Sequence, residues 1–120
     1  MLQNRKLLFW EGSSKKDFKE FPVPVQKDMG VALFVVQLGR TPSSAKPWKG
    51  LGSGVYELVE DHQGDTFRAV YTVRVGDAVH VLHAFQKKSK SGIATPQPDV
   101  ELIKKRLKAV LAHYGLNGRS

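Results

Sequence analysis

The stretch from Gly54 to Lys90 constrains the fold more than any other part of the chain, because it holds three strand-like runs separated by two turns. These runs, which are rich in β-branched and aromatic residues, are Val55–Glu60, Thr66–Val75 and Ala78–Phe85. Gly76 and Asp77 match a two-residue hairpin turn of type II′, which prefers glycine at its first central position. We therefore predict a three-stranded antiparallel meander.

The second run assigns side chains to the two faces of this sheet, since side chains alternate along a strand. The face predicted to be core carries Phe67, Ala69, Tyr71, Val73 and Val75. The face predicted to be polar carries Thr66, Arg68, Val70, Thr72 and Arg74. Lys87, Lys88 and Lys90 follow the third run, so one side of the sheet presents cations from a strand and from a loop. The alternative is that these charges are ordinary solvated surface.

The charge balance favours a polyanionic partner. The 120 residues include 19 lysines and arginines against 11 aspartates and glutamates, which gives a net charge of +8. Nucleic acid is the usual partner of such a protein, because phosphate contacts release counterions. Cysteine is absent, which excludes disulfides, thiolate metal sites and a cysteine nucleophile.

Four further elements complete the predicted fold around the meander. They are a short strand at Leu7–Trp10, a short helix capped near Ser13 or Ser14, a helix over Val25–Leu38, and a helix that Asp99 caps and Gly115 ends. Strand is an alternative for Val31–Val36, which is rich in β-branched residues. The length suggests one domain, residues 1–120, and the apolar run near the N-terminus is too short for a signal peptide or a membrane span. Cytoplasmic location is therefore the expectation.

A basic loop is predicted at Arg40–Ser53, where proline, glycine and serine are frequent. It carries Lys46, Trp48 and Lys49, a combination compatible with nucleic-acid contact, because bases stack on aromatic rings beside cations. An equally good interpretation is that Trp48 closes the edge of the core.

The search for catalytic motifs is mostly negative. The glycines at 50, 52 and 54 are not followed by the residues of a phosphate-binding loop. No two histidines have a metal-binding helical spacing, so we expect no metal and no cofactor. His80 and His83 are three apart on one predicted strand, which puts them on opposite faces. His83 is either a proton-transfer group or a half-buried histidine with satisfied hydrogen bonds.

Residues 50 to 108 resemble a known family. The features that carry the resemblance are Tyr56-Glu57-Leu58, Phe67-Arg68 with Tyr71, Leu82–Lys88, Thr95-Pro96 and Lys104–Leu107. Together they resemble the phage-derived Gp49-like branch of the HigB/RelE toxins of type II toxin–antitoxin systems. The resemblance implies an α+β, RelE-like single domain, with a small, mainly antiparallel sheet, two N-terminal helices on one face and a C-terminal helix.

The resemblance also implies an activity and its residues. Such toxins are ribosome-dependent, metal-independent mRNA endonucleases, in which the ribose 2′-hydroxyl attacks the adjacent phosphate. Arg68 corresponds to the arginine that grips the scissile phosphate, Lys88 to the basic residue beyond the last strand, Lys87 is its neighbour, and His83 is a proton-transfer candidate. We expect Lys46, Lys49, Arg74 and Lys90 to bind nucleic acid. The lysines that RelE-type toxins carry on the strand of Glu57 and Val59 are absent, so the general base stays open.

The implied partners are mRNA on the ribosome and a cognate antitoxin, of the helix-turn-helix, HigA-like kind. We expect no membrane partner. Two other function classes fit the same residues: a non-catalytic RNA- or DNA-binding module that uses the basic face, and a phage-related structural or assembly protein.

Overall fold

The computed structural model describes residues 5–87 and 95–115, which form one five-stranded sheet and three helices. The strands are β1 (Leu7–Trp10), β2 (Ala45–Pro47), β3 (Val55–His62), β4 (Asp65–Thr72) and β5 (Ala78–Lys87). The helices are α1 (Ser14–Phe18), α2 (Val23–Gln37) and α3 (Gln97–His113). The strand order is β1-β5-β4-β3-β2, and every neighbouring pair is antiparallel except β1 with β5. The predicted α+β class and meander are confirmed.

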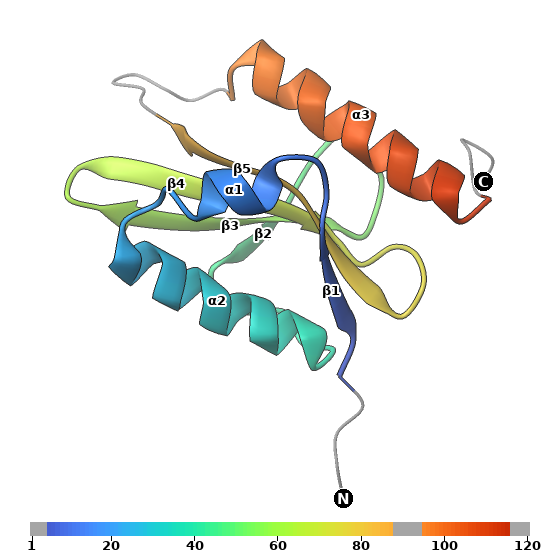
Figure 1. Ribbon diagram of the computed structural model, residues 1–120, viewed down its shortest axis with the longest axis horizontal. Helices are drawn as coiled ribbons and strands as arrows, with labels where there is room; N and C mark the ends of the chain where they lie inside the picture. The colour runs from blue at the N-terminus through green and yellow to red at the C-terminus, as the bar shows by residue number, and fades with distance from the viewer. Residues whose placement is uncertain (1–4, 88–94, 116–120) are drawn as a thin grey trace, which may run out of the picture.

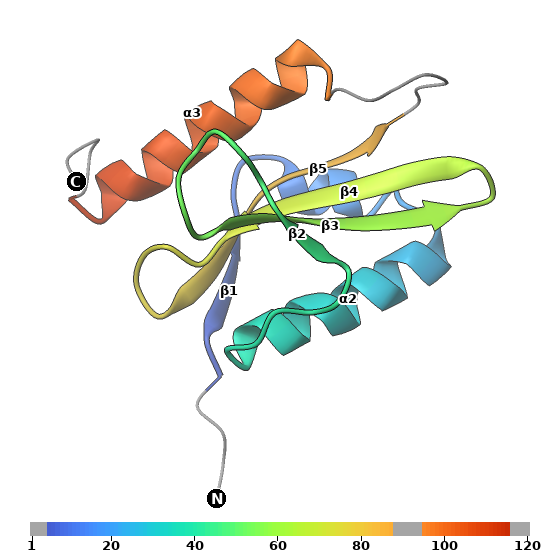
Figure 2. The ribbon, with the colours of Figure 1, turned by 180° about the vertical axis from the view of Figure 1, so that it is seen from behind.

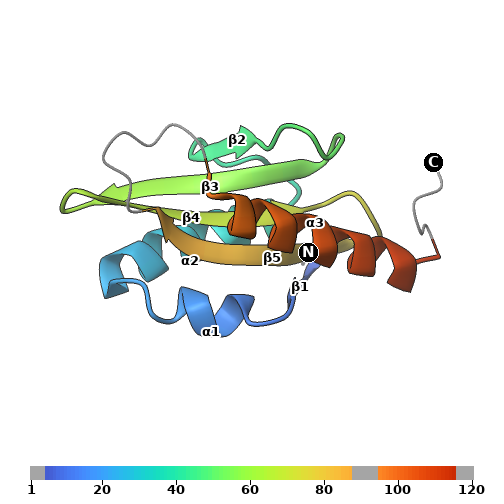
Figure 3. The same cartoon turned by 90° about the horizontal axis from the view of Figure 1, so that it is seen from above.

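The sheet separates two helical layers, with α2 on one side and α3 on the other (Figure 1). The short helix α1 packs on the same face as α2, since Phe18 belongs to the same buried cluster. Viewed onto the opposite face, α3 crosses in front of β4 and β5 (Figure 3). The predicted arrangement of two N-terminal helices on one face and a C-terminal helix is confirmed. We name the two sides the α2 face and the α3 face.

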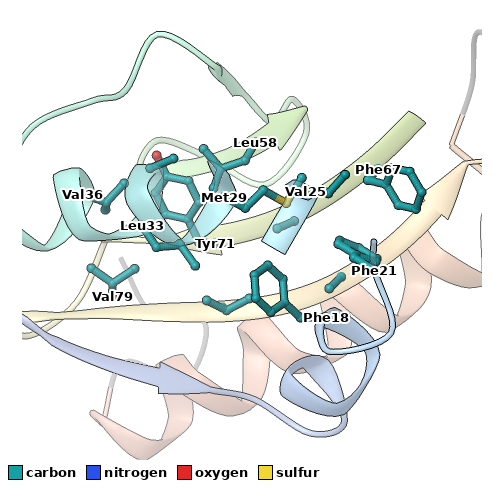
Figure 4. Close-up of a cluster of buried hydrophobic side chains, with 14 residues drawn as sticks. Phe18, Phe21, Val25, Met29, Leu33, Val36, Leu58, Phe67, Tyr71 and Val79 are labelled. Carbon is teal, nitrogen blue, oxygen red and sulfur yellow. The ribbon is translucent and has the colours of Figure 1, made fainter. Parts of the chain in front are cut away.

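The core of the α2 face is apolar and rich in aromatic residues (Figure 4). Side chains at helical spacing on α2 pack against alternate residues of the strands. The members labelled in the figure are Phe18, Phe21, Val25, Met29, Leu33, Val36, Leu58, Phe67, Tyr71 and Val79. Helix α2 begins after Pro22 and ends in a Schellman motif, in which Gly39 has a φ of +89° and Arg40 donates to the Val35 carbonyl at 3.2 Å.

The α3 face has a core of its own, which corrects one prediction. Val70 and Thr72, expected on a polar face of the sheet, are 0% exposed. This core joins residues of the strands and of the β4–β5 connection to the inner stripe of α3: Val55, Val70, Val75, Leu82, Phe85, Ile103, Leu107 and Val110. The prediction was wrong because alternation separates the two faces of a strand but does not tell which face another element covers. Val75 was predicted on the face of Phe67, and it lies on the α3 face because it follows the end of β4.

One turn prediction also needs correction. Strand β4 ends at Thr72, so residues 73–77 form the connection to β5 and Gly76-Asp77 is not a two-residue hairpin. The β4–β5 ladder ends at Thr72, whereas the Val73 amide still donates to the Gly54 carbonyl, on the β3 side, at 2.9 Å. The tight turn lies at Gln63-Gly64, where both φ angles are positive, +50° and +87°, as a type I′ turn requires.

Smaller differences concern element ends. Helix α3 begins after Pro96, so Asp99 lies in its first turn and does not cap it. Strand β2 lies inside the segment predicted to be loop. No helix within residues 5–87 and 95–115 is long and apolar enough to cross a membrane.

Candidate active site

The strand register brings three of the expected catalytic residues onto one face of the sheet. Arg68 on β4 lies opposite Phe85 on β5. His83 and Lys87 lie two residues before and after Phe85, so both are diagonal neighbours of Arg68 on the α3 face. The sheet alone therefore places the His83 imidazole and the Lys87 ammonium group on either side of the Arg68 guanidinium.

A carboxylate joins this group from β3. The Arg68 Nη1 atom donates to Glu57 Oε1 at 2.6 Å, and the two side chains are only 18% and 15% exposed. Such partial burial makes the pairing stronger than that of a fully solvated pair. The Nε atom of Arg68 is buried, and among the described residues it has no hydrogen-bond partner. Because this Nε atom is buried, a ligand can meet the Arg68 guanidinium only at its other nitrogen atoms.

Glu57 also lines a groove on the α3 face. The groove has a volume of about 680 Å³, and its lining residues are Lys46, Pro47, Trp48, Lys49, Glu57, Thr95 and Val100. Lys46 on β2 lies directly opposite Glu57 in the sheet. The expected nucleic-acid contacts Lys46 and Lys49 therefore border the same groove as the Arg68–Glu57 pair. Trp48 lines the groove and also packs against the core of the α3 face, which fits the interpretation that it closes the edge of the core, and its contact with nucleic acid stays a prediction.

Lys87 lies on this face at the end of β5, opposite Thr66, and the residue is 8% exposed. The predicted residues Lys88 and Lys90 lie outside the described residues. The expected proximity of Arg68 and Lys88 therefore stays a prediction, and Lys87 is the one lysine of this run that the structure describes.

His83 is buried against α3, and its residue is 5% exposed. Its Nε2 atom lies 2.7 Å from Asp99 Oδ1, and its ring stacks on Phe85. Arg106 lies on the other side of the imidazole, with Nη1 3.5 Å from Nδ1. These contacts fit the interpretation of His83 as a half-buried histidine with satisfied hydrogen bonds, and they also hold α3 against β5.

The expectation that His80 and His83 lie on opposite faces is wrong. They pair with Thr72 and Val70, which are two residues apart and so share one face. The register between β4 and β5 shifts between Val70 and Tyr71, as in a β-bulge, and this shift absorbs the odd spacing. Both histidines therefore contact α3 or the residue that follows it.

Arg74, another expected nucleic-acid contact, lies at the opposite end of β4 from Thr66. Its side chain donates to the carbonyl oxygens of Ser53, at 3.0 Å, and Leu51. These bonds hold the loop between β2 and β3, which rises toward α3 (Figure 2). Leu51 packs there against the core of the α3 face.

A comparison of the sequence with known protein families agrees with the resemblance that its motifs indicate. A family model described as phage-derived protein Gp49-like (DUF891) matches residues 16–108. The chain belongs to this Gp49-like family. The predicted placement in the Gp49-like branch is confirmed. No curated protein matches the sequence of this Gp49-like chain. Among solved structures it is similar to the toxin–antitoxin complex RelBE2 from Mycobacterium tuberculosis, with 16% identity, a TM-score of 0.45, and coverage of 73% of this chain and 98% of that chain.

The residue that sequence reasoning missed in this Gp49-like protein is Glu57. From the sequence, Glu57 is part of a family motif and a strand position without lysine, and it is assigned no role in the site. Its signal was present in the sequence, because an acidic residue stands between Val55 and Val59 on one face of a strand. A carboxylate at such a position needs a cationic partner, and Arg68 on the neighbouring strand supplies it.

Proposed function

We propose that this Gp49-like protein is the toxin of a type II toxin–antitoxin system and acts as a metal-independent mRNA endonuclease on the ribosome. The observation that carries the proposal is the Arg68–Glu57 pair beside a groove bordered by Lys46 and Lys49. Family membership supports it, together with the resemblance of residues 50–108 to HigB/RelE toxins.

In the proposed reaction a ribose 2′-hydroxyl attacks the adjacent phosphorus atom. Glu57 takes the hydroxyl proton as general base, since its carboxylate lies in the groove and is held in place by Arg68. The bond between phosphorus and the 5′-oxygen breaks, which leaves a 2′,3′-cyclic phosphate and a free 5′-hydroxyl. Arg68 stabilises the negative charge that develops on the phosphoryl oxygens with N–H groups of its guanidinium.

The leaving 5′-oxygen needs a proton from a second group. Lys87 is the described residue best suited to this role, because it lies diagonally beside Arg68 on the same face. Lys88 is the second candidate. His83 is the third, and its use requires release from Asp99. Lys46, Lys49, Arg74 and Lys90 are proposed to bind the RNA backbone, and Trp48 offers a ring on which a base can stack.

The proposed partner is an antitoxin, of the helix-turn-helix, HigA-like kind, that covers this basic surface in the cytoplasm. Because the chain carries a net charge of +8, an acidic partner should associate quickly, and salt should slow the association. Stopped-flow mixing at low and at physiological ionic strength measures this effect. An association rate that is the same in both buffers would contradict the proposed electrostatic attraction.

The central experiment is induction in bacteria with and without the antitoxin gene, followed by mapping of mRNA ends. We expect growth arrest only without the antitoxin, with new 5′-hydroxyl ends in translated messages. Arg68→Ala should lower the cleavage rate by about a hundredfold or more. Arg68→Lys, which keeps the charge but loses the planar guanidinium, should restore part of this rate. Arg40→Ala, which removes an exposed arginine outside the site, is the matched control.

Thermal melts of both variants complete the test. An Arg68→Ala protein that folds and still cleaves at the wild-type rate would contradict the mechanism. A wild-type protein that binds RNA in gel shifts but leaves mRNA ends unchanged would instead support the alternative of a non-catalytic RNA-binding module.

A further inference from the structure

A second hollow lies on the α3 face, at the other end of α3 from the groove. It has a volume of about 310 Å³, and it is lined by Phe9, Glu11, His80, Ala109, Val110, His113 and Tyr114. The lining comes from β1 and the residue after it, from β5, and from the end of α3. None of these residues lines the groove beside Arg68 and Glu57.

Glu11, His80 and Tyr114 form a hydrogen-bonded row at this hollow, and the row leaves hydrogen-bond acceptors free for a ligand. His80 Nδ1 lies 2.7 Å from Glu11 Oε2, and His80 Nε2 lies 3.0 Å from the Tyr114 hydroxyl. A neutral imidazole that donates to the carboxylate accepts from the phenol, so the lone pairs of the Tyr114 oxygen stay available. The other carboxylate oxygen of Glu11 makes no hydrogen bond within the described part of the chain.

Aromatic rings form the walls around these acceptors. Phe9 is 41% exposed and stacks on His80 with ring centroids 5.1 Å apart. Tyr114 meets His80 edge-on, and it is held from outside by Gly76, where an added Cβ atom would lie 2.8 Å from the tyrosine ring. His113 contributes a further exposed ring at the rim. A flat ligand can therefore stack on the exposed Phe9 ring and leave the buried imidazole of His80 in place.

We propose that this hollow binds a guanine base of the RNA, an inference that rests on the proposed function. A carboxylate and a phenolic oxygen are both acceptors, so they select a planar ligand with neighbouring donors. Guanine offers two, the ring N1–H and the exocyclic amino group, whereas uracil has no amino group and the Watson–Crick edges of adenine and cytosine pair a single amino group with an acceptor. Aromatic walls suit any base, and the acceptors supply the selectivity.

The surroundings favour a nucleic acid over an arginine side chain of a protein partner, which would offer similar donors. Lys104, Lys105 and Lys108 are exposed on α3, between the two hollows, and they attract phosphates and repel a cation. Helix α3 spans both hollows, from Val100 at the groove to His113 here. At about 1.5 Å per residue, these two positions are roughly 20 Å apart along the helix. One RNA strand crossing α3 can thus reach both sites.

The test uses the full chain and four free nucleotides as probes, with binding followed by the ring resonances of His80 and Tyr114 in NMR titrations. We expect GMP to bind at least about tenfold more tightly than UMP or IMP, because IMP lacks only the exocyclic amino group. Glu11→Gln should lower this preference by about tenfold, since an amide accepts less strongly than a carboxylate. CMP is the fourth nucleotide probe. Thermal melts verify that the Glu11→Gln protein is folded.

If Glu11→Gln does not fold, Phe9→Ala replaces it, because it trims an exposed ring and should weaken GMP binding. Equal affinity for GMP and IMP would overturn the proposal, as would tighter binding of free arginine than of GMP. The mRNA cleavage of the same samples separates the two proposals. A protein that selects GMP without cleaving mRNA contradicts the proposed function alone, and one that cleaves mRNA without selecting GMP contradicts this inference alone.

Discussion

The two faces of the sheet are built from different kinds of residue. On the α2 face the buried cluster consists of apolar and aromatic side chains. On the α3 face a smaller apolar cluster shares its space with His80, His83, Thr72 and the Arg68–Glu57 pair. The central strands β4 and β5 serve both faces, so the same segments supply packing on one side and polar groups on the other.

This difference separates stability from chemistry. Apolar burial stabilises a fold in proportion to area, whereas half-buried charges contribute little net stability unless each has its partner. The α2 face can therefore carry most of the folding energy. The α3 face holds partly buried charged groups, and it is the face on which the proposed site lies. Four predictions test this division, in decreasing order of expected effect.

The largest effect is expected from Glu57→Gln on the α3 face. Loss of a general base lowers a reaction rate by about a hundredfold to ten-thousandfold, while the amide still fits the space beside Arg68. The measurement is the cleavage rate of a ribosome-bound message, together with RNA affinity, which should change little. A wild-type cleavage rate in the variant would remove Glu57 from the chemistry and weaken the contrast between the faces.

The second prediction compares a leucine-to-alanine substitution on the α2 face with one on the α3 face. Leu33→Ala on the α2 face and Leu107→Ala on the α3 face each truncate a buried leucine, and each should cost about 2–5 kcal/mol of unfolding free energy. Only Leu107→Ala should also lower the cleavage rate per folded molecule, because α3 holds His83 through Asp99. Urea unfolding and single-turnover cleavage measure the two quantities. Equal loss of cleavage in both variants would contradict the division.

A smaller effect is expected from Arg74→Ala, which removes the bonds to the carbonyls of Ser53 and Leu51. We expect a loss of about 1 kcal/mol in unfolding free energy, as for a typical hydrogen bond. Urea melts measure it, with Arg40→Ala as the exposed control. Unchanged melts with a weaker salt dependence of RNA binding would instead assign Arg74 to the RNA, as the sequence predicts.

The smallest effect lies on the α2 face, where Glu60 meets Asp28 of α2. Burial, a hydrogen bond to Asp28 and the negative charge of Asp28 raise the pKa of Glu60 from 4.5 to about 7. The folded chain thus holds this proton more tightly than the unfolded chain, so the pair stabilises the fold at acidic pH. That contribution is lost as the pH rises from about 4.5 toward 7.

Because water screens this partly exposed pair, we expect a change of at most about 1 kcal/mol. Glu60→Gln should remove the difference, and melts of both proteins across this pH range measure it. Cleavage should not depend on this substitution, since Glu60 points to the face opposite Arg68. A parallel loss of activity would show that the two faces are coupled through β3.

Much of the fold was predictable because local rules decide it. The strand Leu7–Trp10 has the predicted bounds, and Gly39 and Gly115 end their helices as expected. The errors arose where distant segments decide the outcome. Alternation could not show that α3 covers Val70 and Thr72, and no local signal marks the register shift after Val70.

The candidate site was predictable in part. Arg68, His83 and Lys87 share a face because their strand positions imply it once the register is known. Glu57 was missed because a search for cations in a basic protein passes over carboxylates. The row of Glu11, His80 and Tyr114 could not be predicted from the sequence, because Glu11 lies 69 residues and Tyr114 lies 34 residues from His80 in the chain. Only the tertiary fold brings such residues together.

The parallel pairing of β1 with β5 also dictates an order of assembly. Strand β1 is the first to leave the ribosome, yet its partner β5 begins 71 positions later, where Leu7 pairs with Ala78. Contacts between such distant segments form late, after local hairpins such as β3–β4. Helix α3, which borders both hollows, follows β5 in the chain. During its own synthesis the nascent chain therefore lacks both hollows, and a ribosome is not exposed to them before most of the protein has been made.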